Sequence, residues 1–328
     1  MPFSQTRFPY CESLLSYLVV LNKSHGRKLV MKKYRTNSAK FTIAMVTASL
    51  IIGACGGSSS SSDSANTPGS STLTGGGSSF VANLLDICSA RYNGDALVNP
   101  NKDTVSYSSV GSGTGKTNFA SRTYKFGATD SMYSSGAPDN FVYVPLVAGP
   151  IGIGYRLDGM TPANVSLQLK AETVAKIFAG SIKVWNAPEI VADNSSSQDV
   201  VSLPATPIVV AYRSGTSGTT SNFTDYLNKT SPSIWTKTAN DSFTTAFPLS
   251  LPTDGTFQAA SGSDGVANYV QDHNGAITYT EFSYLEERAA KGVKSAAVQN
   301  NSGAFVLPSS SASTDFFTEA TVDEAGTV

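Results

Sequence analysis

The sequence is poor in the residues on which many enzymes and metal sites depend. Its 328 residues include two histidines, His25 and His273, and three cysteines, Cys11, Cys55 and Cys88. No two cysteines form a CxxC pair, so no zinc or redox motif is supported, and we expect neither a metal nor a cofactor. Only 14% of the residues are charged, against about 25% in average proteins.

The few charges are unevenly distributed along the chain. The residues before Cys55 contain eight of the 23 Lys and Arg and one of the 24 Asp and Glu. The remainder therefore carries 15 basic and 23 acidic residues. A net-acidic body argues against nucleic acid or an anionic membrane surface as a partner. Any anion would have to be bound by local dipoles and hydrogen-bond donors.

The N-terminal part of the chain has the pattern of a targeting signal. A basic region precedes an apolar run of thirteen at residues 41–53, which suits the core of a signal peptide better than a membrane span. The run ends in Gly53-Ala54-Cys55, which resembles a bacterial lipobox. We expect an upstream extension at 1–30, a signal peptide at 31–54, and a lipidated Cys55 that begins a flexible Ser/Gly tether at 55–72. The alternative is a cleavable signal with an incidental cysteine.

Beyond residue 72, predicted strands and helices alternate, which is typical of an α/β sheet with helices on its faces. The helix expected at 80–92 would be capped by Ser78 or Ser79, with Cys88 as a small buried apolar residue. The uncharged stretch 141–155 is expected to form a pair of buried strands that passes between two lobes.

Three glycine- and hydroxyl-rich turns each follow a predicted strand and precede a predicted helix, at 77–80, 111–115 and 214–219. Ligands bind at the carboxyl ends of strands in open α/β sheets. Helix N-termini present free N–H groups and partial positive charge, which suits an anion. The third turn also follows Arg213, which can donate two parallel hydrogen bonds. By itself this turn fits an ordinary loop with a surface arginine, but the recurrence favours an anion site.

Two catalytic interpretations fail on particular residues. Residues 111–117 look like a phosphate loop of an ATPase, but Val110 occupies the position of the first glycine. A secreted serine hydrolase or phosphatase using Ser112 or Ser217 lacks a general base, because His273 lies in a predicted turn. We therefore expect a binding protein and no enzyme.

The turns, in this order, resemble the PstS family of periplasmic or lipid-anchored phosphate-binding proteins that serve the phosphate ABC transporter. The resemblance runs from about residue 73 to about 305 and rests on six segments. They are Leu73–Phe80, Tyr107–Gly113, Phe126–Asp130, Ile177–Trp185, Arg213–Thr219, and Gly262–Val266 with Gly275–Tyr279.

This resemblance implies a two-lobed type II periplasmic-binding-protein fold with mixed sheets, flanking helices and the ligand in the cleft between the lobes. Lobe I would comprise 73–147 and 276–328, and lobe II 148–275. The implied function is extracytoplasmic binding of HPO4²⁻ or H2PO4⁻ and its delivery to an ABC permease. We expect a monomer, in the periplasm or at the cell surface, that meets the membrane only through its lipid anchor.

Carried over by position, the phosphate ligands are spread over all three turns, and Asp130 accepts a proton of the bound anion. They are Ser79, Phe80, Ser112, Asp130, Arg213, Ser217, Gly218 and Thr219.

The sequence departs from the family pattern at two places. Gly215 stands where the family usually has an aspartate that steadies the arginine, and the chain stops at Val328, where relatives usually continue. The first lobe is therefore expected to be incomplete at its C-terminal end. The alternative functions are a repurposed or truncated surface or adhesion protein, or a protein that binds another oxyanion.

Overall fold

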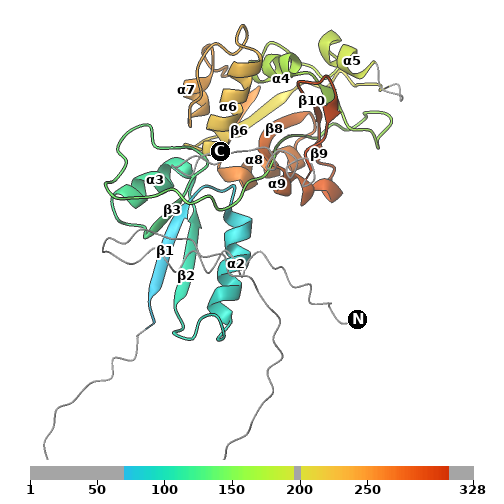
Figure 1. Cartoon of the computed structure of the whole chain (residues 1–328). Coiled ribbons are helices and arrows are strands. Elements are labelled where there is room, and N and C mark those ends of the chain that lie inside the picture. The colour runs from blue at the N-terminus through green and yellow to red at the C-terminus, as the bar shows by residue number, and fades with distance from the viewer. Residues whose placement is uncertain (1–69, 196–200, 310–328) are drawn as a thin grey trace, which may run out of the picture. The chain divides into compact units, whose positions relative to one another are not determined.

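The computed structural model describes residues 70–195 and 201–309 (Figure 1), which belong to one compact unit that begins at Ser70. The predicted upstream extension, the signal peptide and Cys55 with nearly all of its tether lie outside the described residues. Residues 310–328, which bear on the prediction of an incomplete first lobe, also lie outside them.

The first sheet consists of three parallel strands in the order β2-β1-β3. These strands are β1 (Thr72–Gly77), β2 (Thr104–Ser109) and β3 (Phe126–Ala128). Helix α2 (Ala82–Gly94) connects β1 to β2, and helix α3 (Ser112–Ala120) connects β2 to β3. Because the strands are parallel, the turns that follow them lie at the same edge of the sheet.

The second sheet is mixed and has the order β7-β6-β8-β4-β9. Strand β6 is parallel to β7 and β8, whereas β4 is antiparallel to β8 and β9. The strands are β4 (Ile151–Tyr155), β6 (Val209–Arg213), β7 (Phe257–Ala260), β8 (Ala276–Glu281) and β9 (Lys294–Ser295). A third sheet, β11-β10-β5, pairs β5 (Gln168–Leu169), β10 (Ala297–Gln299) and β11 (Phe305–Val306).

The remaining helices connect or flank these strands (Figure 1). They are α4 (Ala171–Phe178), α5 (Pro188–Asn194), α6 (Gly218–Thr230), α7 (Phe243–Ala246), α8 (Gly262–Asp272), α9 (Phe282–Glu286) and the 3₁₀ helix Ala289–Lys291. Among the described residues, no helix is long and apolar enough to cross a membrane.

The sheet pairing differs from the predicted grouping of residues 276–328 with lobe I. Strands β8 and β9 pair with β4 and β6, and β10 pairs with β5, so residues 276–306 join the sheets of the second half. The antiparallel register of β4 with β8, from Ile151↔Glu281 to Tyr155↔Ile277, accounts for this difference.

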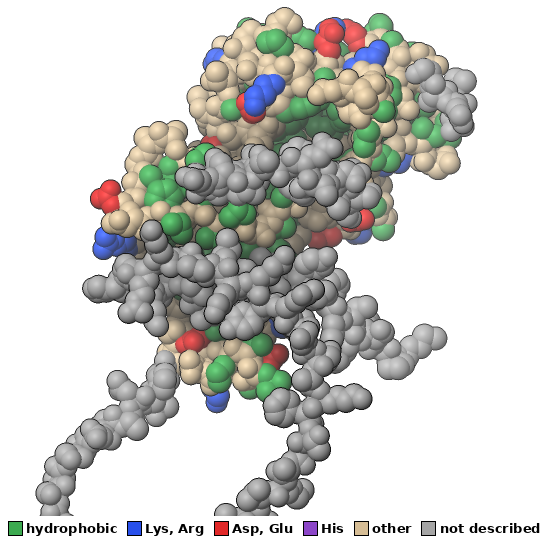
Figure 2. Space-filling view, viewed as in Figure 1, with side chains coloured by type: hydrophobic (Ala, Val, Ile, Leu, Met, Phe, Trp, Pro, Cys, Tyr) green, Lys and Arg blue, Asp and Glu red, His purple; other side chains and the backbone are tan. Residues whose placement is uncertain are grey.

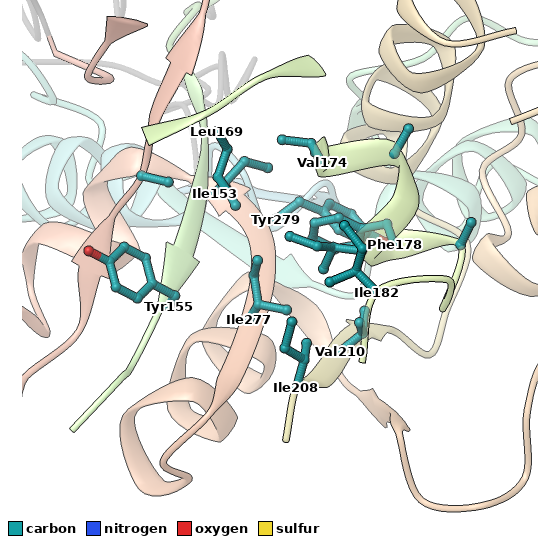
Figure 3. Close-up of a cluster of buried hydrophobic side chains, with 14 of the residues drawn as sticks. Ile153, Tyr155, Leu169, Val174, Phe178, Ile182, Ile208, Val210, Ile277 and Tyr279 are labelled. Carbon is teal, nitrogen blue, oxygen red and sulfur yellow. The ribbon is translucent and has the colours of Figure 1, made fainter. Parts of the chain in front are cut away.

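The main hydrophobic core lies beside the large sheet, where β4, β6 and β8 pack against α4 and α6. In Figure 3 the side chains of Phe178, Ile182, Val210 and Tyr279 gather from different elements into one cluster. The Tyr279 ring stacks on that of Phe223 with 4.3 Å between the ring centroids. Burial of large side chains of this kind contributes about 1.5–3 kcal/mol each, so this core fixes β6 and β8 side by side.

Only part of the predicted strand pair at 141–155 forms. Residues 151–155 are strand β4, whereas 141–150 contain no strand and Val142 is 69% exposed. Pro145 and Pro150 lack the N–H that a sheet ladder requires. The lack of charge in this run predicted a strand, whereas its two prolines disfavour a strand.

One expectation at α2 is also corrected. The helix begins after Val81, which makes no side-chain cap, so neither Ser78 nor Ser79 caps it. Cys88 is buried, as expected.

Candidate anion-binding site

The three predicted turns meet through backbone contacts. The Gly111 N–H donates to the Gly77 carbonyl oxygen (2.7 Å), and the Gly113 N–H donates to the Thr216 carbonyl oxygen (3.2 Å). A Cβ at Gly113 would lie 1.9 Å from Thr216 Oγ1, so only glycine allows this approach. The turns after β1, β2 and β6 thus form one continuous cluster of loops at the N-termini of their helices.

Helix α6 begins inside this cluster and presents its N-terminus to Asp130. Ser217 is the N-cap, and its Oγ accepts from the Thr220 N–H (3.3 Å). A Cβ on Gly218 would lie 2.7 Å from the Asp130 backbone carbon and Cβ. Thr219 Oγ1 donates to Asp130 Oδ2 (3.1 Å). The first turn of α6 therefore supplies hydroxyl and N–H donors at one carboxylate, in keeping with the helix dipole.

Asp130 follows β3 and is anchored through its backbone. Its N–H contacts Ser112 Oγ (3.4 Å), and its carbonyl oxygen accepts from Asn222 Nδ2 (2.8 Å). Burial raises the pKa of the Asp130 carboxyl above its ordinary value, while hydrogen bonds from the Ser78 and Thr219 side chains oppose the increase. A carboxyl group in this environment binds a proton more readily than an exposed one.

Arg213 ends β6 and is 4% exposed. Its Nη1 donates to Ser263 Oγ (3.2 Å), and Ser263 Oγ shares a hydrogen bond with Ser79 Oγ (2.8 Å). The buried Nε of Arg213 has no hydrogen-bond partner. Burial lowers the pKa of Arg213, and the charges of Glu281 and Asp130 partly offset that effect. A buried guanidinium with an unused donor is suited to an anionic partner.

All eight predicted ligand residues lie in this loop cluster or at the strand and helix ends that border it. Five side chains are almost fully buried: Ser79, Ser112, Arg213, Ser217 and Thr219. Phe80 is half-buried, and its N–H donates to Ser78 Oγ (3.0 Å). The N–H that the sequence assigned to phosphate is therefore already engaged within the first turn.

Two residues that the sequence interpretation did not include in the site lie near Arg213, namely Ser263 and Glu281. Ser263 lies in the first turn of α8, and its N–H donates to Ser79 Oγ (3.1 Å). Glu281 ends β8, is 3% exposed, and accepts from Thr280 Oγ1 (3.1 Å). The segment Gly262–Val266 is another glycine- and serine-rich helix start, a signal that could have identified Ser263.

Glu281 also bears on the missing aspartate at Gly215. A Cβ at Gly215 would meet no atom within 4 Å, so this position is open. Burial raises the pKa of Glu281 from its ordinary value near 4.5 to about 8, and hydrogen bonds and the charge of Arg213 limit the increase. The acid near Arg213 therefore comes from a neighbouring strand.

The residues of the two rejected catalytic interpretations have other partners. Lys116 Nζ donates to Asp241 Oδ2 (2.8 Å) and Ser131 Oγ (2.9 Å). The His273 ring stacks on Tyr269 with 3.9 Å between the ring centroids. Within the described ranges, no three His, Cys, Asp or Glu side chains form a group that could hold a metal ion.

On the face shown in Figure 2, the Lys and Arg side chains of the described residues are scattered among acidic, polar and apolar ones. The groups best suited to an anion are the buried ones described above.

Several known proteins resemble this chain in sequence and in fold. A family model described as "PBP superfamily domain" matches residues 62–326. The phosphate-binding protein PstS of Haemophilus influenzae is 32% identical over 242 residues, which is 73% of this chain and 66% of that protein. PstS2 of Mycobacterium bovis is 37% identical over 191 residues, 55% of this chain and 47% of its own length.

Solved structures share the fold. A periplasmic phosphate-binding protein called PfluDING, solved with phosphate, has a TM-score of 0.57 at 24% identity and covers 77% of this chain and 69% of its own. An ancestral soluble variant of the human phosphate binding protein has a TM-score of 0.58 at 24% identity, over 77% and 70% of the two chains. These likenesses confirm the predicted periplasmic-binding-protein fold.

The alignments with mycobacterial relatives span about half the length of those proteins. The family model nevertheless covers most of this chain, and the curated relatives carry the PstS name. The chain therefore belongs to the PstS family within the periplasmic-binding-protein superfamily.

Proposed function

We propose that this protein binds inorganic phosphate outside the cytoplasm and delivers it to an ABC permease for import. The observation that carries this proposal is the pairing of Asp130 with Thr219 at the N-terminus of α6, close to a buried Arg213 with an unused Nε donor. Relatives that are named phosphate-binding proteins support the choice of anion.

The donors for phosphate come from several turns. Arg213 supplies charge, α6 supplies the N–H of Gly218, and the buried hydroxyls supply further hydrogen bonds. The proposed ligands are Ser79, Phe80, Ser112, Asp130, Arg213, Ser217, Gly218 and Thr219. Hydrogen bonds to a charged group contribute about 1.5–3 kcal/mol each, and a micromolar Kd requires about 8 kcal/mol. A subset of these donors is sufficient after the cost of ordering the ligand.

Asp130 gives the site its preference for a protonated anion. HPO4²⁻ and H2PO4⁻ each carry a proton that the carboxylate can accept, whereas sulfate at neutral pH carries none. Sulfate would face the Asp130 carboxylate as a like charge, an arrangement that costs several kcal/mol. This chemistry requires no bond to be made or broken, so the proposed role is binding alone.

The proposed location follows from the N-terminal pattern and from the family. We place the protein in the periplasm or at the cell surface, as a monomer anchored through a lipidated Cys55. Two lobes would close on the anion, with the sheet of β1, β2 and β3 on one side of it and the sheet of β4, β6, β7, β8 and β9 on the other.

Isothermal titration of the purified chain with phosphate and with sulfate tests this function. We expect a micromolar or tighter Kd for phosphate, much weaker binding of sulfate, and no hydrolysis of a phosphate ester. The variant Arg213→Gln should lose phosphate affinity, whereas Lys125→Ala, at an exposed cation, should keep it. A folded protein that binds no phosphate, or that binds it equally well without Arg213, would refute the proposal.

A further inference from the structure

Two buried polar atoms of opposite charge type lack partners in the same part of the molecule. They are Arg213 Nε, a donor, and Glu281 Oε1, an acceptor. Buried polar groups are nearly always hydrogen-bonded in folded proteins. Two such exceptions on residues of opposite charge therefore need a functional explanation.

The sheet register places these residues at the same edge of the large sheet. Strands β6 and β8 are parallel neighbours, with Val209↔Ala276 and Ala211↔Thr278 in register. Continuing that register puts Arg213 level with Thr280, one residue before Glu281. Both strands end here, so the two side chains lie at the carboxyl edge where the anion is proposed to bind.

Ser263 connects the two charged groups to the first turn. It accepts from Arg213 Nη1, shares a hydrogen bond with Ser79, and its side chain also stabilises the Glu281 carboxylate. Ser263 is fully buried. A change in the charge of Glu281 is thus transmitted directly to the group that holds Arg213.

Other charged and titratable groups around Glu281 do not replace Arg213 as its partner. Tyr284 on α9 and Tyr279 on β8 are neutral at physiological pH, because burial raises the pKa of both phenols. On α8, Asp264 is exposed and paired with Arg288. Directly after α9, Glu287 is exposed and contacts Asn83 and Arg288.

The charge balance then decides how Glu281 affects an anion. Ionisation of Glu281 adds one negative charge to the site before any anion arrives. In a buried site of low effective dielectric constant this difference is large, and the ionised carboxylate also competes for the Arg213 donors.

We propose that Glu281 is a proton-controlled competitor of the bound anion for Arg213, so that its neutral form supports binding and its ionised form opposes it. This inference rests on the proposed function and adds a pH control to the same site. Glu281 acts through Arg213 and Ser263, so it is a positioning residue and not a ligand.

The first test is a series of phosphate titrations of the full chain between pH 6.5 and 9.5, with wild type, Glu281→Gln and the control Glu286→Gln. Glu286 is an exposed acid at the end of α9, the helix that follows Glu281. Dividing the wild-type affinity by that of Glu281→Gln removes the titration of phosphate itself. Because Glu281 titrates at about pH 8, this ratio should fall about ten-fold between pH 7 and pH 9.

The second test does not depend on a variant that folds. Carbon-13 NMR of the side-chain carboxyls in wild type should show one glutamate that titrates near pH 8 and whose midpoint rises on saturation with phosphate, because coupling between two binding events is reciprocal. Parallel pH profiles of wild type and Glu281→Gln, or a midpoint that phosphate leaves unchanged, would overturn this inference while the proposed function stands. A folded wild type that binds no phosphate at any pH would overturn both.

Discussion

Replacing Asp130 with asparagine tests the chemical basis of anion selectivity with little disturbance of the fold. The substitution keeps an acceptor for Thr219 Oγ1 (3.1 Å) and leaves the backbone contacts of residue 130 to Ser112 and Asn222 in place. It removes the negative charge and the ability to accept a proton from the ligand, and it replaces one acceptor oxygen with an NH2 donor. The variant should therefore fold normally.

The expected effect is a change in selectivity. Phosphate loses one charge-assisted hydrogen bond, which contributes about 1.5–3 kcal/mol, while sulfate is relieved of a like-charge contact. Since about 1.4 kcal/mol corresponds to a ten-fold change in affinity, the ratio of phosphate to sulfate affinity should fall at least about ten-fold in Asp130→Asn.

Competition calorimetry at pH 7.5 measures this ratio directly, with phosphate titrated into protein in the absence and presence of sulfate. Asp139→Asn is a matched control, because Asp139 is an exposed acid in the same half of the chain. If sulfate competes equally weakly with wild type and with Asp130→Asn, Asp130 does not set the selectivity, and its assigned role is wrong.

Two further predictions concern stability. Gly218→Ala should lower the free energy of unfolding by about 1–3 kcal/mol, because the added Cβ would lie 2.7 Å from Asp130 atoms; Gly215→Ala, at an open position, is the control, and equal melting temperatures would contradict this packing. Because the folded state raises the pKa of Glu281 from about 4.5 to about 8, it retains a proton that the unfolded chain loses. Its contribution is complete below about pH 4.5 and is lost as pH rises to 8, by at most about 1.4 kcal/mol per pH unit. Urea unfolding across this range should show a smaller decline in Glu281→Gln, and identical declines would count against a buried protonated carboxyl.

The sequence predicted the parts of the site that local pattern specifies. Each of the three turns combines a strand end, glycines and hydroxyls within a few residues, and all three meet as expected. Ser263 escaped this reasoning because its partner Ser79 lies 184 residues away. Glu281 escaped it because an acid at the end of a buried strand carries no local sign of its neighbour on β6.

One wrong strand prediction had a cause that is visible in the local sequence. The apolar run at 141–150 was predicted as a strand from its lack of charge, although Pro145 and Pro150 remove two N–H donors. A single sequence also does not reveal that β8 pairs with β4, a pairing that bears on the predicted grouping of 276–328 with lobe I. Sequence reasoning was thus accurate for turn chemistry and weak for the partners of strands.

The close backbone contacts at the glycines of the turns show which part of the site is structural. Cβ atoms added at Gly77 and Gly115 would lie only 2.0 Å and 2.4 Å from backbone atoms of neighbouring segments, so the main chain itself holds the turns together. The hydroxyls and the carboxylate add hydrogen bonds to that frame, such as the one from Thr219 to Asp130. A substitution that keeps these glycines should therefore alter the chemistry of the site more than the positions of its turns.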